Sequence, residues 1–237
     1  MKNLKAIFLV LFSIVFTSSC SFAQEKTIID KTYPVQSFSS IEFDAVAKVI
    51  YTQDSKFSVR AEGDKESIDK LTVNVSKGVL KIDHNGKFST KSKKRLTIYI
   101  SSPAIEKIDV EGVGNWILQG KVKAPHLKID FEGVGNFEAL DLEVPSIQVE
   151  YEGVGNLRLA GTTNSLKLKS EGVGSIDIQN LIAKNVVLTA SGVGSVKLYA
   201  SESIDLNNEG VGSVTYYGNP TVKNIKNSGV GKIKQGD

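Results

Sequence analysis

The tripeptide Gly-Val-Gly occurs seven times in this 237-residue chain, at intervals of 18–21 residues. The first glycines of the seven copies are Gly112, Gly133, Gly153, Gly172, Gly192, Gly210 and Gly229. Nearly constant spacing over seven copies indicates a repeat architecture. Because one such unit cannot bury its own apolar face, neighbouring units are expected to stack on one another.

Apolar and polar residues alternate on both sides of each motif, which is the period of a β-strand. The inward column before the motif holds Ile108, Ile129, Val149, Leu168, Leu188, Leu206 and Ile225. The inward column after it holds Trp116, Phe137, Leu157, Ile176, Val196, Val214 and Ile233. Each repeat is therefore predicted to be a strand, a Gly-Val-Gly turn, a second strand and a looser return such as residues 160–164. Parallel stacking of these units gives an all-β fold, a β-solenoid of two-strand coils of 18–21 residues each.

The two glycines of each motif allow two interpretations. They fit a tight turn that needs a positive φ or a close approach of backbones. They also fit an unbroken strand in which a larger inward side chain would find no room. The sequence leaves both open.

A second column predicts how the core changes along the rod. The position two residues before the first glycine holds Phe131, Tyr151, Ser170, Ala190, Asn208 and Asn227 in successive copies. This order predicts a core that thins, or becomes an asparagine ladder, toward the C-terminus.

Residues 24–105 lack the motif but contain several apolar segments with strand periodicity. Residues 64–69 are the only plausible helical turn in this part. Because no Pro- or Ser-rich linker precedes the repeats, residues 24–105 are expected to continue the stack or to cap its first coil. Residues 106–237 are expected to form the repeat solenoid of the same domain.

Residues 1–23 have the pattern of a signal peptide. Lys2 and Lys5 precede an apolar run over residues 6–16, and small residues follow at Ser21 and Ala23. We favour cleavage after Ala23; a lipid anchor at Cys20 is the alternative, weakened by Thr17 where such sites prefer Leu. Both predict an exported protein, in the periplasm, at the outer-membrane surface or outside the cell. Since no second long apolar run follows, the mature chain is expected to lack a transmembrane span.

Composition argues against several classes of protein. One cysteine cannot build a disulfide framework or a multi-cysteine metal site, and a formal charge of +3 does not suit a dedicated nucleic-acid binder. The repeats lack the third glycine of a dinucleotide fingerprint and the Gly-Lys-Ser/Thr of a phosphate loop. His84 and His126 are expected to be exposed loop residues rather than catalytic bases. The sequence thus predicts no cofactor, apart from the calcium considered next.

Six carboxylates of the first three repeats are expected to form two neighbouring columns on one face. These residues are Asp109, Glu111, Asp130, Glu132, Glu150 and Glu152. Like charges stacked opposite one another are destabilising, so something must offset them. Calcium suits an all-oxygen cluster and makes these six the candidate metal ligands. The alternative is neutralisation by Lys107, Lys128 and water.

A separate group of five cations lies within residues 87–95, namely Lys87, Lys91, Lys93, Lys94 and Arg95. It could contact an acidic polysaccharide or the phosphates of lipopolysaccharide. The alternative interpretation, which holds more often for such runs, is a solvated hairpin loop.

Several segments resemble a known family. Residues 38–43 (FSSIEF), 78–82 (GVLKI) and 96–100 (LTIYI), followed by Pro103 and the glycine repeats, are similar to the family called "putative auto-transporter adhesin, head GIN domain". The resemblance covers essentially the whole mature chain. It implies a right-handed, pectin-lyase-like β-helix in exported proteins of Gram-negative bacteria, a role in adhesion, and no recognised catalytic residues.

The function predicted from the sequence is that of a non-enzymatic cell-envelope protein that binds polysaccharide or another envelope component through a face of the solenoid. A structural rod without a specific ligand is the second hypothesis, and a polysaccharide-active enzyme the third. The acidic columns are the only candidate paired carboxylates for such an enzyme, and their recurrence favours architecture over one active site. Tyr217 is a candidate to stack on sugar rings, whereas Tyr216 is expected to point inward. A homo-oligomer is an open alternative.

Overall fold

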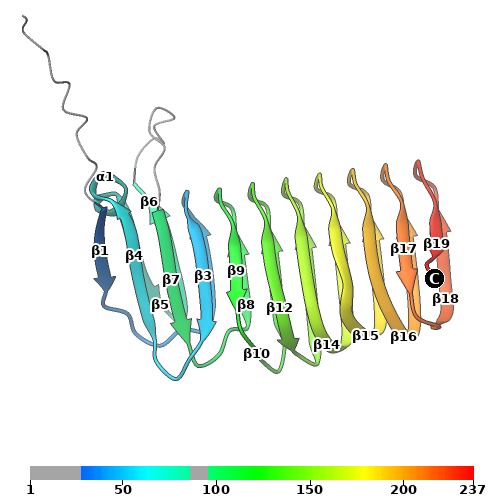
Figure 1. The fold of residues 1–237 in the computed structure, drawn as a ribbon, viewed down its shortest axis with the longest axis horizontal. Coiled ribbons are helices and arrows are strands. Elements are labelled where there is room, and N and C mark those ends of the chain that lie inside the picture. Colours follow the sequence, from blue (N-terminus) through cyan, green and yellow to red (C-terminus); the bar gives the residue numbers. More distant parts are fainter. Residues whose placement is uncertain (1–27, 86–95) are drawn as a thin grey trace, which may run out of the picture.

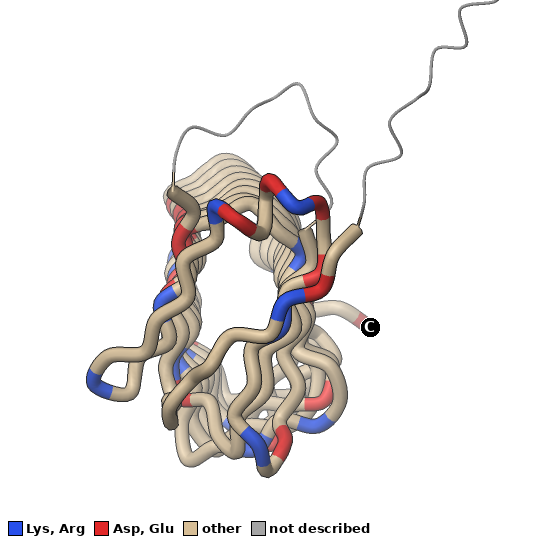
Figure 2. Tube along the Cα trace, turned by 90° about the vertical axis from the view of Figure 1, so that its left-hand side faces the viewer, with Lys and Arg blue, Asp and Glu red and all other residues tan. Residues whose placement is uncertain are grey.

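In a computed structural model, which describes residues 28–85 and 96–237, the chain forms a rod of stacked coils (Figure 1). Two walls of strands face each other and are joined by two rows of bends, as the view along the rod shows (Figure 2). Strands of successive coils pair in parallel, so the predicted all-β solenoid is confirmed.

The first wall begins with strands from both parts of the chain. From the N-terminal end of the rod onward it contains β5 (Leu71–Ser76), β6 (Val79–His84), β2 (Ser40–Asp44), β8 (Lys107–Val110), β11 (Leu127–Phe131) and β13 (Ser146–Tyr151). The second wall contains β1 (Ile28–Tyr33), β4 (Ser58–Asp64), β7 (Leu96–Ser102), β3 (Lys48–Gln53), β9 (Trp116–Gln119) and β12 (Phe137–Glu143). The short strand β10 (Val122–Lys123) stacks on the end of β12.

Three long strands then contribute to both walls. They are β14 (Leu157–Ser170), β15 (Ile176–Ala190) and β16 (Val196–Asn208), and β17 (Val214–Tyr217), β18 (Thr221–Asn227) and β19 (Ile233–Gln235) complete the rod. Residues 160–164, predicted as a looser return, lie inside β14. The backbone stays in the hydrogen-bonded ladder there because the neighbouring coil bends at the same level, with Gly161 opposite Leu142 on one side and Leu181 on the other.

The N-terminal part both continues the stack and caps it. Strands β6 and β7 pair with β2 and β3 on the side away from the repeats, although they follow β3 in sequence. Beyond them the pairing becomes antiparallel, with β5 against β6 and β4 against β7. The predicted helical turn is α1 (Lys65–Asp69), and the Asp64 carboxylate caps it by accepting a hydrogen bond from the Ser67 backbone N–H.

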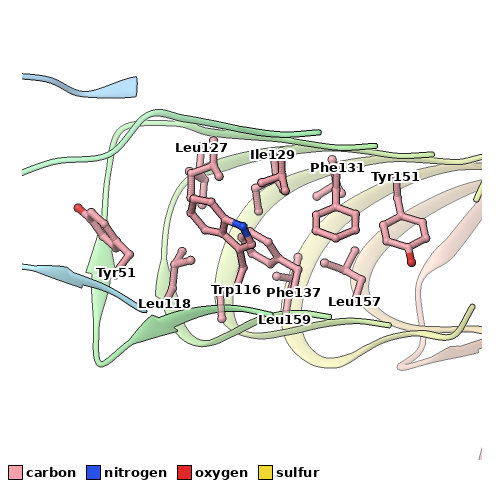
Figure 3. Packing of buried hydrophobic residues seen from close by; sticks show 14 of the residues in the cluster. Tyr51, Trp116, Leu118, Leu127, Ile129, Phe131, Phe137, Tyr151, Leu157 and Leu159 are labelled. Carbon is pink, nitrogen blue, oxygen red and sulfur yellow. The ribbon is translucent and has the colours of Figure 1, made fainter. Parts of the chain in front are cut away.

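Aromatic side chains fill the middle of the rod (Figure 3). The Trp116 and Phe137 rings are stacked with centroids 6.3 Å apart, and the Phe131 and Tyr151 rings are stacked at 5.5 Å. The next residues in the Phe131–Tyr151 column are Ser170, Ala190 and Asn208, all buried. Asn208 donates a 2.7 Å hydrogen bond from Nδ2 to Oδ1 of Asn227. The predicted thinning is confirmed, and its last step is an asparagine pair.

Each Gly-Val-Gly segment forms a bend between two separate strands, so the tight-turn interpretation is confirmed and the unbroken strand is wrong. The first glycine approaches the neighbouring coil closely: a Cβ at Gly153 would lie 2.3 Å from the carbonyl oxygen of Gly133 and 2.7 Å from the Phe131 ring. The second glycine has a positive φ, +142° at Gly155, where a Cβ would also lie 1.8 Å from the carbonyl oxygen of Gly135. The valine between them points outward.

Candidate binding surfaces

The outward valines form a single row along one whole edge of the rod, which we call the crest; it follows the upper row of bends in Figure 1. Consecutive members pair as parallel bridges: Val46, Val113, Val134, Val154, Val173, Val193, Val211 and Val230. Their exposed fractions rise from 36% at Val46 to 71% at Val230. Val46 was not predicted to belong, because its neighbours are Ala45 and Ala47 rather than glycines.

Two polar ladders run beside the crest. The acidic ladder lies two residues before each valine: Asp44, Glu111, Glu132, Glu152, Glu171, Ser191, Glu209 and Ser228. The amide ladder lies two residues after it: Lys48, Asn115, Asn136, Asn156, Ser175, Ser195, Ser213 and Lys232. All are exposed. Within the amide ladder Asn136 donates a 3.0 Å hydrogen bond from Nδ2 to Oδ1 of Asn115, and Asn156 does the same to Asn136 at 2.9 Å. The amide ladder was not predicted, although its fixed offset from the motif was visible.

The inner of the two predicted acidic columns is in register, with Asp130 opposite Asp109 on one side and Glu150 on the other. Lysines lie between these carboxylates. Lys107 Nζ is 2.8 Å from an Asp109 carboxylate oxygen and 3.5 Å from one of Asp130. Lys128 Nζ is 3.1 Å from Asp130 and 3.6 Å from Glu150. These are the two lysines that the sequence analysis named as the alternative to calcium for neutralising the carboxylates.

The outer column is less well neutralised. The pKa of Glu132 is raised from its ordinary value, first by burial and then by the charges of Glu152 and Glu111. Lys169 lies farther along, 2.9 Å from Glu171 and 3.7 Å from Glu152. In the described part of the chain no group of three or more His, Cys, Asp and Glu side chains is placed to hold a metal ion. Calcium binding by the six carboxylates stays a prediction.

The opposite row of bends carries a groove of about 400 Å³, which we call the edge groove. It is lined by Glu143, Val144, Pro145, Thr162, Thr163, Asn164, Ile182, Lys184 and Ser201. Ile182 is 45% exposed and supplies an apolar floor, while hydroxyl, amide and ammonium groups surround it. Lys123 and Lys121 hydrogen-bond the Glu143 carboxylate and lower its pKa, so it stays ionised.

Other predicted residues fall elsewhere. His126 is an exposed loop residue 3.9 Å from Glu106, as predicted, whereas His84 lies in β6 and not in a loop. Tyr216 packs against the core, but Tyr217 is only half-exposed. A Cβ at Gly236 would lie 2.3 Å from its ring, so the backbone covers the ring that was expected to stack on sugars. The cluster at residues 87–95 and the signal peptide lie outside the described residues.

No helix within residues 28–85 and 96–237 is long and apolar enough to cross a membrane. The described residues form a rod with an apolar crest on one edge and a groove on the opposite edge. This combination defines a class of protein, the β-solenoids that offer long surfaces for binding.

Within that class, the chain belongs to the family described as "putative auto-transporter adhesin, head GIN domain", which it matches over residues 37–220. This confirms the resemblance seen in the sequence. No curated protein matches the chain.

The same fold occurs in crystal structures of similar proteins. A "putative adhesin" from Bacteroides fragilis is 33% identical, with a TM-score of 0.86, and the match covers 89% of this chain and 97% of that one. A "putative lipid binding protein" from Parabacteroides distasonis is 19% identical with a TM-score of 0.68, covering 90% and 98% of the two chains. A "putative adhesin" from Parabacteroides merdae is 17% identical with a TM-score of 0.65 and the same coverage. The last two show the fold alone.

Proposed function

We propose that this protein is an exported, non-enzymatic adhesin that binds a polysaccharide in the edge groove. The observation that carries the proposal is the groove itself, because its volume of about 400 Å³ falls in the range of small-molecule sites, roughly 300–1,000 Å³. Membership of an adhesin family supports the binding role.

The groove chemistry suits a sugar. Ile182 and Pro145 offer apolar surface to the C–H face of a ring, and Thr162, Asn164 and Ser201 offer hydroxyl and amide groups to its hydroxyls. Lys184 is the cation of the lining, and its ammonium lies 3.7 Å from Glu202 outside the groove. A few polar groups around an apolar floor is the usual composition of a ligand site.

The same groove argues against hydrolysis. Most glycosidases need two carboxyl groups, one of them protonated to act as an acid. Glu143 is the sole carboxylate among the described lining residues, and lysine hydrogen bonds lower its pKa. A group held ionised in this way is poorly suited to donate a proton.

Binding of the purified protein to immobilised laminarin, xylan, polygalacturonate, heparin and lipopolysaccharide tests this proposal. The groove variant Asn164→Ala with Ile182→Asp is expected to weaken saturable binding at least tenfold, which corresponds to about 1.4 kcal/mol. Val187→Asp is the matched control, because Val187 and Ile182 are both 45% exposed and Val187 does not line the groove. Loss of binding in Glu132→Ala with Glu152→Ala instead would move the site to the acidic ladder. No binding to any polymer would favour a structural rod.

Export rests on residues 1–23 and on the adhesin family. Mass spectrometry of the protein from the producing cell is expected to find a chain that starts at Gln24. A lipid-modified Cys20 at the N-terminus would support the anchored alternative, and an intact Met1 would contradict export by this route.

A further inference from the structure

The crest is an unusually regular apolar surface. Eight valines are stacked one coil apart, which at about 4.8 Å per strand spacing makes a row about 34 Å long. The residues next to each repeat valine are glycines, so no neighbouring side chain of the bend covers it. Because valine is stiff at χ1, little side-chain entropy is lost when such a row is covered. A contiguous exposed apolar surface rimmed by polar residues, as this one is by the two ladders, marks an interaction surface.

We propose that the crest is the interface with a second copy of this chain, in a dimer whose two rods run parallel. The two-fold axis lies along the rod direction, between the two crests. The interface is distinct from the edge groove, which lies on the opposite row of bends.

Complementarity in charge and in hydrogen-bonding groups between the two ladders selects this partner and this direction. The chain crosses the crest from the first wall to the second, so the acidic ladder lies on one side of it and the amide ladder on the other. In the parallel dimer with its coils level, each acidic-ladder residue faces the amide-ladder residue of the same coil in the partner. The facing pairs are Asp44 with Lys48, Glu111 with Asn115, Glu132 with Asn136, Glu152 with Asn156, Glu171 with Ser175, Ser191 with Ser195, Glu209 with Ser213 and Ser228 with Lys232. Every carboxylate meets a cation, an amide or a hydroxyl.

Other arrangements match less well. In an antiparallel pair the two acidic ladders would face each other, and like charges across an interface are unfavourable. The ladder already repels itself, since Glu152 and Glu111 raise the pKa of Glu132. A membrane with anionic lipids, or an anionic polymer, would meet the same repulsion.

The parallel dimer has a consequence for binding. Both α1 ends lie at the same end of the assembly, and the two edge grooves face away from each other. Two grooves on one particle raise the avidity for a repeating polymer without any new contact.

Analytical ultracentrifugation of the purified protein at micromolar concentration tests the interface. The wild type is expected to sediment as a dimer, and Val154→Asp with Val173→Asp as a monomer. Both valines are 50% exposed, so the substitutions remove little from the core, and thermal unfolding checks that the variant folds. Val187→Asp, on the outward face of the first wall, is expected to remain dimeric. A monomeric wild type, or a dimer that survives the crest substitutions, would overturn the inference. If the wild type is monomeric and the crest variant loses polysaccharide binding, the crest is a ligand surface instead.

Cross-linking tests the direction. In a Cys20→Ser background, Val46→Cys is expected to form a disulfide-linked dimer with itself, because the two-fold axis brings both copies of residue 46 together. A mixture of Val46→Cys and Val230→Cys proteins is expected to give no mixed dimer, since these residues lie at opposite ends of the crest. A mixed dimer as the main product would show antiparallel rods and contradict the proposal.

Discussion

The N-terminal coil, formed by β2 and β3, and the repeat coils have the same bend with an outward valine, but they form it with different residues. In the repeats, glycines flank each outward valine, whereas Ala45 and Ala47 flank Val46. A Cβ on each repeat bend would point at the backbone of the preceding coil, as the 1.8 Å approach at Gly155 shows. On the corresponding side of Ala45 and Ala47 lies the coil of β6 and β7, which is not joined by a Gly-Val-Gly segment.

One buried tyrosine in each region differs in its hydrogen bonding. The Tyr51 hydroxyl, in the N-terminal coil, lies 3.0 Å from the Ser102 hydroxyl. The Tyr151 hydroxyl, in the repeats, is buried with no hydrogen-bond partner among the described residues, and burial raises its pKa to about 12. Both differences indicate that the neighbouring coil, more than the local strand, decides which side chain a position accepts.

The largest effect is expected when the residues of the two bends are exchanged. Gly155→Ala is expected to lower the free energy of unfolding by about 3 kcal/mol or more, because the new Cβ combines a positive φ with a clash against Gly135. Ala47→Gly is expected to cost only about 1 kcal/mol, the usual entropic cost of glycine. Urea unfolding measures both. Equal effects would mean that the neighbouring coil does not dictate the glycine.

Removing one hydroxyl from each region should move stability in opposite directions. Tyr151→Phe is expected to raise the free energy of unfolding by about 1 kcal/mol, because it removes a buried polar group that lacks a partner. Tyr51→Phe is expected to lower it by about 1 kcal/mol, because the hydrogen bond between the Tyr51 and Ser102 hydroxyls is lost. Urea unfolding again reports both. If Tyr151→Phe proves destabilising, the Tyr151 hydroxyl has a partner such as a buried water.

The lysines that contact the inner acidic column predict a smaller effect. Lys128→Met is expected to lower the free energy of unfolding by less than about 1 kcal/mol, the usual range for partly exposed ion pairs. If the lysines beside Asp130 and Glu150 offset the columns by themselves, the unfolding temperature of the wild type is the same in calcium and in chelator. A rise of several degrees with calcium in the wild type would instead support a metal held by the six carboxylates.

The smallest effect is expected at Glu132. A carboxylic acid whose pKa is raised by folding holds its proton more tightly in the folded chain, so its repulsion destabilises the protein above that pKa and vanishes as pH falls below the ordinary value of 4.5. Glu132→Gln should therefore raise the unfolding temperature slightly at pH 7 and leave it unchanged at strongly acidic pH. Differential scanning calorimetry at both pH values measures this. A gain that persists in acid would have another cause.

Much of the fold could be predicted, because the same inward positions recur at fixed offsets in all seven repeats. The inward columns, the bends and the thinning past Tyr151 all follow from residues at fixed offsets. That β6 and β7 lie on the side of β2 and β3 away from the repeats could not be predicted, since it depends on pairing between segments that share no motif. Val46 was missed for the same reason.

Less of the binding surface could be predicted. The stacked carboxylates were visible as columns, and the amide ladder at Asn115, Asn136 and Asn156 could have been found at its constant offset. The edge groove could not, because it is formed where the returns of different lengths in β12, β14, β15 and β16 lie side by side. Such a shape depends on differences between repeats, which a search for their common motif discards.

Incubation of the wild type with the polysaccharide that it retains, followed by measurement of new reducing ends, tests most directly whether this solenoid binds without cleaving. The lone ionised Glu143 predicts saturable binding and an unchanged chain length after prolonged incubation. New reducing ends that accumulate with the wild type and disappear with Glu143→Gln would contradict a purely adhesive role.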